Sequence, residues 1–123
     1  MSNFDTPVII KEHTGSTYTI TTGDYGAVHT NRGGGACTYT LPAPSAALKG
    51  VWVDFFVIVA GDNVITTAAG NELVLLNDAL ATSLTIGQNG EEIGNGVHVV
   101  CDGTSWLCFV NLAAEAVTLT VGA

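Results

Sequence analysis

The stretch that decides the fold is residues 51–67, VWVDFFVIVAGDNVITT, in which two apolar runs flank the turn Gly61-Asp62-Asn63. β-Branched and aromatic residues fill both runs, and such residues favour strands. In the first run, residues 51–59, apolar side chains occupy both faces except at Asp54, as in a central strand that is covered on both sides. The stretch therefore predicts two strands, the first of them inside a sheet.

Asp54 interrupts the first apolar run, where a carboxylate is costly unless it is paired or exposed. It could pair with Lys49 or Arg32, or it could lie at a boundary between subunits. Alternatively, it could protect a sheet edge against unwanted pairing. The sequence leaves these alternatives open.

The rest of the chain repeats short β-rich runs between turn signals. Residues 44–50 predict a single helical turn, and Asp102-Gly103 predicts a hairpin. We expect strands at residues 8–10, 16–21, 36–41, 64–67, 97–101, 106–110 and 116–121, and a strand, a loop and a strand within 72–84. The predicted fold is therefore all-β, a β-sandwich or jelly-roll-like barrel of roughly eight to ten strands.

We expect one β-domain, residues 7–123, preceded by a flexible N-terminal arm, residues 1–6. Residues 31–35, NRGGG, form the most glycine-rich segment. They predict either a long, mobile surface turn or a place where two backbones approach closely.

The composition points to a chain that is buried against other chains. Hydrophobic residues make up 47% of the sequence and charged residues 11%, whereas ordinary soluble domains are roughly 25% charged. The net charge is −8 and only three residues are basic. Binding to nucleic acid or to an anionic membrane relies on many Lys and Arg side chains, so we expect neither partner.

The sequence predicts folding in a reducing cytosol. Residues 1–5 lack the basic start and apolar run of a signal peptide, and no run of about 18 apolar residues occurs. Cys101 and Cys108 lie on the two arms of the predicted hairpin, where a disulfide is conceivable. Because the three cysteines are an odd number, free buried thiols, Cys37 included, are the preferred interpretation.

No motif in the chain points to catalysis. The three histidines lack a metal-binding spacing, and no G-x-S-x-G elbow is present. We interpret His13 and His29 as turn residues and His98 as a structural residue within a strand. We therefore expect no enzyme activity, no catalytic residue, no cofactor and no metal site. Calcium bound by turn acids is the alternative, and those acids are Asp24, Asp62, Asp78 and Asp102.

The order of several short motifs resembles a β-module of tailed-phage virion proteins. The motifs are Leu41-Pro42, Gly50, the strand at 55–59, residues 63–66, and Asp102-Gly103 followed by Trp106. The similarity covers residues 39–110. Modules of this kind occur in head decoration proteins, head-fibre proteins and segments of tail fibres, and they typically form symmetric trimers.

The resemblance implies a capsid decoration protein that binds the mature phage shell as a homotrimer and stabilises it. Its partners would be further copies of itself and the major capsid protein. It would be made in the host cytoplasm and reside on the outer capsid surface of the virion. The short chain lacks a coiled-coil shaft, which favours decoration over a fibre. The alternative is a tail-fibre or receptor-binding β-domain that recognises host surface glycans.

Two groups of residues are candidates for the contacts that this function requires. The apolar side chains of Trp52, Phe56 and Ile58 are expected in the core or at the trimer interface. The arm residues Ser2, Asn3, Phe4 and Asp5 are the candidates for capsid attachment. Glycan recognition needs exposed aromatic rings beside carboxylates or amides, but Trp52 and Trp106 are predicted to be core residues.

Overall fold

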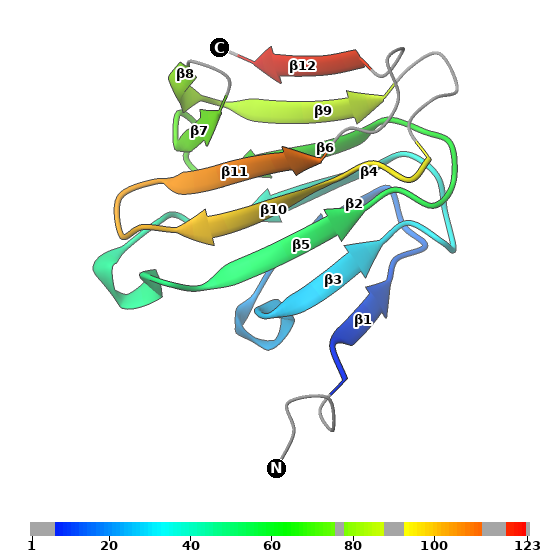
Figure 1. The fold of residues 1–123 in the computed structure, drawn as a ribbon, viewed down its shortest axis with the longest axis horizontal. Helices are drawn as coiled ribbons and strands as arrows, with labels where there is room; N and C mark the ends of the chain where they lie inside the picture. The colour runs from blue at the N-terminus through cyan, green and yellow to red at the C-terminus, as the bar shows by residue number, and fades with distance from the viewer. Residues whose placement is uncertain (1–6, 76–77, 88–92, 112–117, 123) are drawn as a thin grey trace.

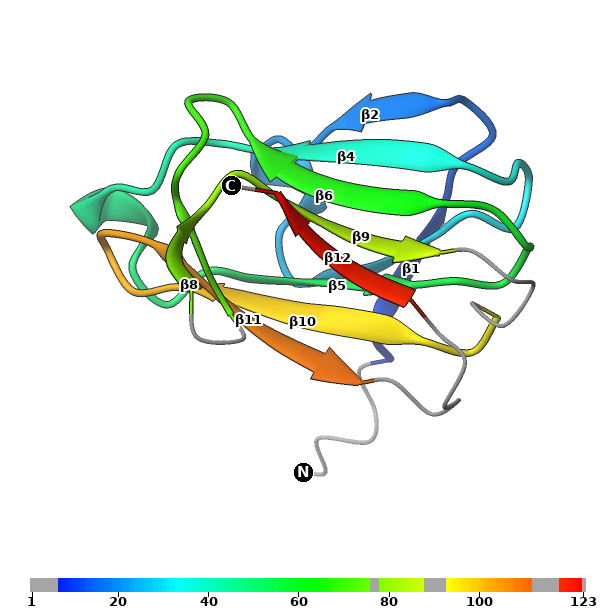
Figure 2. The same ribbon diagram turned by 90° about the horizontal axis from the view of Figure 1, so that it is seen from above.

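The chain folds into two β-sheets that pack face to face, as the two views of the ribbon show (Figures 1 and 2). The computed structural model describes residues 7–75, 78–87, 93–111 and 118–122. Across the seven-stranded sheet the order is β1 (Ile9–Glu12), β3 (Ala27–Thr30), β5 (Trp52–Phe56), β10 (Gly96–Cys101), β11 (Trp106–Asn111), β7 (Leu73–Leu75) and β8 (Asp78–Ala81). Across the five-stranded sheet it is β12 (Thr118–Gly122), β9 (Ser83–Gly87), β6 (Asn63–Thr67), β4 (Cys37–Leu41) and β2 (Thr17–Thr19).

The first six strands alternate between the two sheets, so the chain winds around the core. β3 pairs in parallel with β1 and β5, and β4 pairs in parallel with β2 and β6. Parallel neighbours need a crossover connection, and here a strand of the opposite sheet supplies it. The sequence correctly predicted an all-β fold, and its two-sheet sandwich alternative describes the structure. The parallel winding was not foreseen.

The core lies between the sheets and follows the two-residue alternation of the strands. β5 and β10 turn Val53, Phe55 and Val99 inward, where they meet Ile65 and Leu84 of the opposite sheet. Trp106 is fully buried, and its indole N–H donates a hydrogen bond of 2.9 Å to the Pro42 carbonyl oxygen. The core therefore contains the largest side chain of the hairpin with its polar atom satisfied.

Most predicted strands are present, and the hairpin is confirmed. β10 and β11 pair in antiparallel fashion across a turn in which the Asp102 carboxylate accepts hydrogen bonds from the Thr104 and Ser105 amides. Cys101 faces Trp106 in the ladder, and Cys108 faces Val99. The two thiols are thus not opposite each other, and all three cysteines are free, as preferred.

Two features of the fold were not predicted: the number of strands, and the turn before β3. The described residues contain twelve strands, because residues 72–87 hold three strands and β3 was not foreseen. The helical turn expected at residues 44–50 is a 3-10 turn, η3 (Ala46–Leu48), and a second 3-10 turn, η2 (Thr22–Asp24), precedes β3. No helix in the described part of the chain is long and apolar enough to cross a membrane.

The strand predicted at residues 51–59 ends at Phe56, and a buried side chain bonds the backbone of residues 58 and 59 beyond it. The Asn31 amide oxygen accepts hydrogen bonds from the backbone N–H groups of Ile58 and Val59. Its NH₂ group donates to the carbonyl oxygens of Val59 and Gly35. Asn31 therefore ties the residues after β5 to the glycine-rich segment.

The glycine-rich segment is a place where backbones approach closely. A Cβ atom on Gly61 would lie 2.5 Å from the Ala36 nitrogen and 2.8 Å from the Gly35 carbonyl carbon. A Cβ atom on Gly33 would lie 2.4 Å from the Thr14 methyl group. Of the two alternatives predicted for residues 31–35, close approach is thus the one that describes the structure.

This packing predicts a strong effect of one added methyl group. Gly61→Ala is expected to lower the free energy of unfolding by about 1–3 kcal/mol, because the backbone at residues 35–36 must move. Gly50→Ala is the matched control, since its φ is also positive, at +90°, and nothing lies within 4 Å of its added Cβ atom. Urea unfolding followed by circular dichroism measures both. Equal losses in the two variants would contradict the close approach.

Candidate functional site

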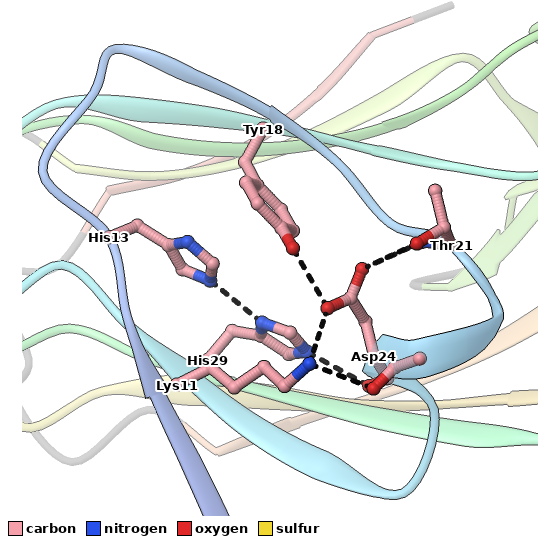
Figure 3. Close-up of polar contacts among 7 residues, drawn as sticks. Lys11, His13, Tyr18, Thr21, Asp24 and His29 are labelled. Atoms are coloured by element: carbon pink, nitrogen blue, oxygen red, sulfur yellow. Dashed lines mark hydrogen bonds and ion pairs between the residues drawn. The ribbon is translucent and has the colours of Figure 1, made fainter.

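Two groups of polar side chains stand out in the described structure. One is buried between the sheets near β1, β2 and β3 and is centred on Asp24 (Figure 3). The other lies on the outer face of the seven-stranded sheet and is centred on Asp54 and His98. Their surroundings differ, so each is considered separately.

The Asp24 carboxylate is 2% exposed, and it accepts hydrogen bonds from three side chains and one backbone amide. The Lys11 ammonium group lies 2.9 Å from Oδ1, and the Tyr18 hydroxyl group donates to the same oxygen at 2.8 Å. The backbone N–H and the hydroxyl group of Thr21 donate to Oδ2 at 2.8 and 3.2 Å. Figure 3 shows these donors converging from β1, β2 and the start of η2.

Two buried imidazoles continue this network. His29 Nε2 lies 3.0 Å from the Asp24 carbonyl oxygen, which can only accept, so Nε2 carries a hydrogen and donates it. In neutral His29 the other nitrogen, Nδ1, then accepts from His13 Nε2, which lies 2.8 Å away. One hydrogen bridges the two rings. The pair can therefore take up one proton, but a second would set two N–H groups against each other.

The surroundings keep Asp24 charged and the imidazoles neutral. Burial alone would raise the pKa of the Asp24 carboxyl, but the hydrogen bonds from Thr21, Lys11 and Tyr18 outweigh it and hold the pKa well below its usual range. Burial lowers the pKa of both His13 and His29, and for His13 the neighbouring His29 ring lowers it further. Because the ion pair with Lys11 is closed and the rings are buried, we interpret this network as structural.

The interpretation of His29 as a turn residue was wrong, because it is buried within β3. His13 does lie in the connection between β1 and β2, but it is buried there. Asp24 is a turn acid, but its oxygens are occupied by side-chain and backbone donors rather than open to calcium. The signal that could have found the group is the two-residue spacing of Lys11 and His13, which places both on one side of a strand.

The second group lies in a continuous row across the outer face. Strand register places Ile10, Val28, Asp54, His98 and Phe109 side by side on β1, β3, β5, β10 and β11. The next row along the strands contains Trp52, Val100 and Leu107. We call these eight residues, together with Phe56, the outer patch.

The outer patch is apolar and exposed. Phe56 is 42% exposed, Phe109 57% and Ile10 56%. The five-stranded sheet packs against the opposite face, and no described helix or strand covers the patch (Figure 1). The loss of alternation in β5 thus has a structural cause: Val53 and Phe55 face the core, while Trp52 and Phe56 face outward.

A carboxylate and an imidazole form a pair at the centre of the outer patch. His98 Nδ1 contacts Asp54 Oδ1, and the two side chains are 43% and 33% exposed. Asp54 therefore pairs with neither Lys49 nor Arg32, and it does not guard a sheet edge, because β5 lies between β3 and β10. Of the alternatives left open by the sequence, a subunit boundary is the one still compatible with its position.

A hollow of about 200 Å³ opens beside this pair. Phe56 and Phe109 line it together with Val28, Asp54 and His98. Gly96 lies opposite Phe56 in the ladder. Because glycine has no side chain, the surface beside Phe56 has a gap there. The patch is therefore a shallow apolar surface with one polar, indented spot.

The residues predicted to make contacts do not lie together in one part of the structure. Trp52 and Phe56 lie on the outer patch rather than in the core, whereas Trp106 is in the core as expected. Ile58 is half-buried beyond the end of β5. The arm residues Ser2, Asn3, Phe4 and Asp5 lie outside the described residues. Within the described ranges, no three His, Cys, Asp or Glu side chains gather as a metal-binding group.

Comparison of the chain with protein families, with curated proteins and with solved structures finds no match. The interpretation of both groups therefore depends on their own geometry and chemistry.

The buried imidazoles predict a loss of stability in weak acid. Because their pKa values are lowered in the folded chain, the unfolded chain binds more protons below pH 6.5, the usual value. The free energy of unfolding is expected to fall by about 1–2 kcal/mol between pH 7 and pH 5.5. It should fall further near pH 4, where Asp24 takes up a proton in the unfolded chain but stays charged in the folded one. His29→Gln is expected to lower stability at pH 7 but to reduce this dependence on pH.

Val53→Ala is the control, because it removes buried apolar volume and no titrating group. Urea unfolding measures the free energy of unfolding of both chains across this pH range. The value for Val53→Ala should be lower than that of the unmodified chain by the same amount at every pH. If His29→Gln shows the same offset and an unchanged slope, the buried pair is not the cause of the acid sensitivity.

Proposed function

We propose that this protein is a phage capsid decoration protein that binds the mature shell as a homotrimer, stabilises it and catalyses no reaction. The observation that carries the proposal is the outer patch, an exposed apolar surface over five strands of a chain with few charges. Exposed apolar surfaces of this kind mark contacts with other proteins. The resemblance of residues 39–110 to virion β-modules supplies the identity of those proteins.

The proposed mechanism is stabilisation by mass action. A trimer that binds the expanded shell and not its precursor adds its binding free energy to the expanded state alone. Many copies on one lattice make the effect large even where each contact is weak. The net charge of −8 keeps the free protein soluble and disfavours contact with the packaged genome.

The buried network supports a structural role in a different way. It joins β1, β2, η2 and β3 through Lys11, Tyr18 and Asp24, which secures the N-terminal third of the sandwich. Residues 1–6 precede this secured part. A rigid domain with a short polar segment in front of it suits attachment in which Ser2, Asn3, Phe4 and Asp5 order against the coat protein.

Co-sedimentation with capsids tests the proposal. The protein is added to expanded capsids of the phage that encodes it, prepared without the decoration protein. We expect saturable occupancy and a higher temperature of shell disruption. Deleting residues 1–5 should leave the circular dichroism spectrum unchanged and lower the occupancy several-fold. Absence of binding by the full chain would refute the proposed function, whereas unchanged occupancy of the deletion variant would refute only the role of the arm.

Glycan recognition is the second candidate, and one observation favours it. Trp52 and Phe109 flank His98 on the outer patch, with ring centroids 5.5 and 6.0 Å from the imidazole, and Asp54 is adjacent. Aromatic rings beside a carboxylate are the elements of a sugar site. However, the pair is surrounded by rows of apolar side chains, and a small polar ligand such as a sugar would not need them for binding.

Nuclear magnetic resonance separates the two functions. Titration with glucose, galactose and N-acetylglucosamine is expected to leave the Trp52 indole N–H signal in place, because the patch is occupied by protein in the proposed assembly. Saturable shifts of this signal that disappear in Asp54→Asn would instead favour the receptor-binding alternative.

A further inference from the structure

We infer that the outer patch is the contact between copies of this chain, arranged so that Asp54 of one copy lies beside His98 of the next. The inference rests on the proposed function because it takes from it that the chain forms a homotrimer. It goes further by assigning the face that trimerises and the polar pair that sets its register.

Charge favours a second copy as the occupant. In the five strands that carry the patch, β1, β3, β5, β10 and β11, the carboxylates are Glu12 and Asp54. Glu12 lies 3.5 Å from Arg32 Nε, and Lys11 of β1 pairs with the buried Asp24. Asp54 is already beside the His98 imidazole. The patch therefore carries almost none of the net charge of −8. Two acidic chains can meet through this face without setting like charges against each other, which they could not do where their other acids are exposed.

The central pair also gives such a contact a register. Both side chains remain partly exposed in the single chain, so they can accept a second partner. In a closed ring of copies, each carboxylate can lie beside the imidazole of the next copy, and every pair is then satisfied in the same way. Apolar side chains around the pair, including Phe56 and Phe109, exclude water from it, as in the centre of stable interfaces.

The first test is the native mass of two matched variants. Phe109 and Leu80 are both large, apolar and more than half exposed, at 57% and 66%, but Leu80 lies on β8 at the far edge of the sheet. In sedimentation velocity we expect a trimer for the unmodified chain and for Leu80→Ser, and a monomer for Phe109→Ser. Circular dichroism should show all three folded, since neither side chain is buried. A monomeric unmodified chain, or a trimeric Phe109→Ser, would overturn the inference.

The second test exchanges the central pair. A double variant with Asp54→His and His98→Asp should form trimers with itself, because each new carboxylate meets a new imidazole. Mixed with the unmodified chain, it would set carboxylate against carboxylate and imidazole against imidazole. Since opposed carboxylates repel each other, mixed trimers should be more than about tenfold rarer than random exchange gives. Native mass spectrometry of differently labelled chains measures this, and random mixing would overturn the placement of the pair.

These outcomes are separable from those of the proposed function. If the chain binds capsids but Phe109→Ser does not change its native mass, the decoration role stands and the assigned face is refuted. A trimer that depends on Phe109 and on the pair, but binds no capsid, would refute the decoration role and leave the assigned contact in place.

Discussion

The constraint on which the sandwich depends is the buried carboxylate of Asp24. A charge that is 2% exposed is tolerated only if donors surround it. Lys11, Tyr18 and Thr21 supply them, and these residues come from three successive segments of the chain. Removing Lys11 would leave the charge without a cation, so the ion pair holds these segments together in addition to the backbone pairing of their short strands. His29 joins the same network through the backbone, because its N–H group bonds to the Asp24 carbonyl oxygen.

The winding of the first six strands explains how this network and the outer patch arise from one architecture. Each step from one sheet to the other brings a new strand beside its predecessor in parallel, so residues one coil apart become neighbours. β5 is the third strand added to the seven-stranded sheet, and β10 then pairs with its free edge. β5 thus has a hydrogen-bonded neighbour on each edge, β3 and β10, while its outer face is not covered by another described strand. Strands that are covered on both faces are apolar on both faces, and a second copy on the outer patch would give β5 that environment in the proposed assembly.

The sequence predicted those parts of the fold that depend on local signals. The hairpin of β10 and β11 follows from Asp102-Gly103, and most strand positions follow from short apolar runs. β3 was missed because Ala27–Thr30 contains only one large apolar residue, Val28, and its place is set by pairing with β1 and β5. The partner of Asp54 could not be found, because it lies 44 residues away on a strand that reaches β5 only through the winding. Trp52 stayed a candidate for either the core or the trimer interface because alternation is lost in β5, so the sequence did not indicate which face was the core.

The distribution of charge connects the interior to the outer surface. Asp24 is compensated inside the sandwich, and Asp54 is beside an imidazole on the patch. Other described acids, such as Asp62 and Asp102, lie at exposed turns between strands. In the described ranges, the charges of these turn acids thus lie at the ends of strands, whereas β3, β5, β10 and β11 together contain one carboxylate, that of Asp54. In the proposed assembly, copies that approach through their sheet faces would avoid repulsion between these charges, and copies that approach through their turns would not. The acidity of the chain would then restrict how copies meet and favour the outer patch as their contact.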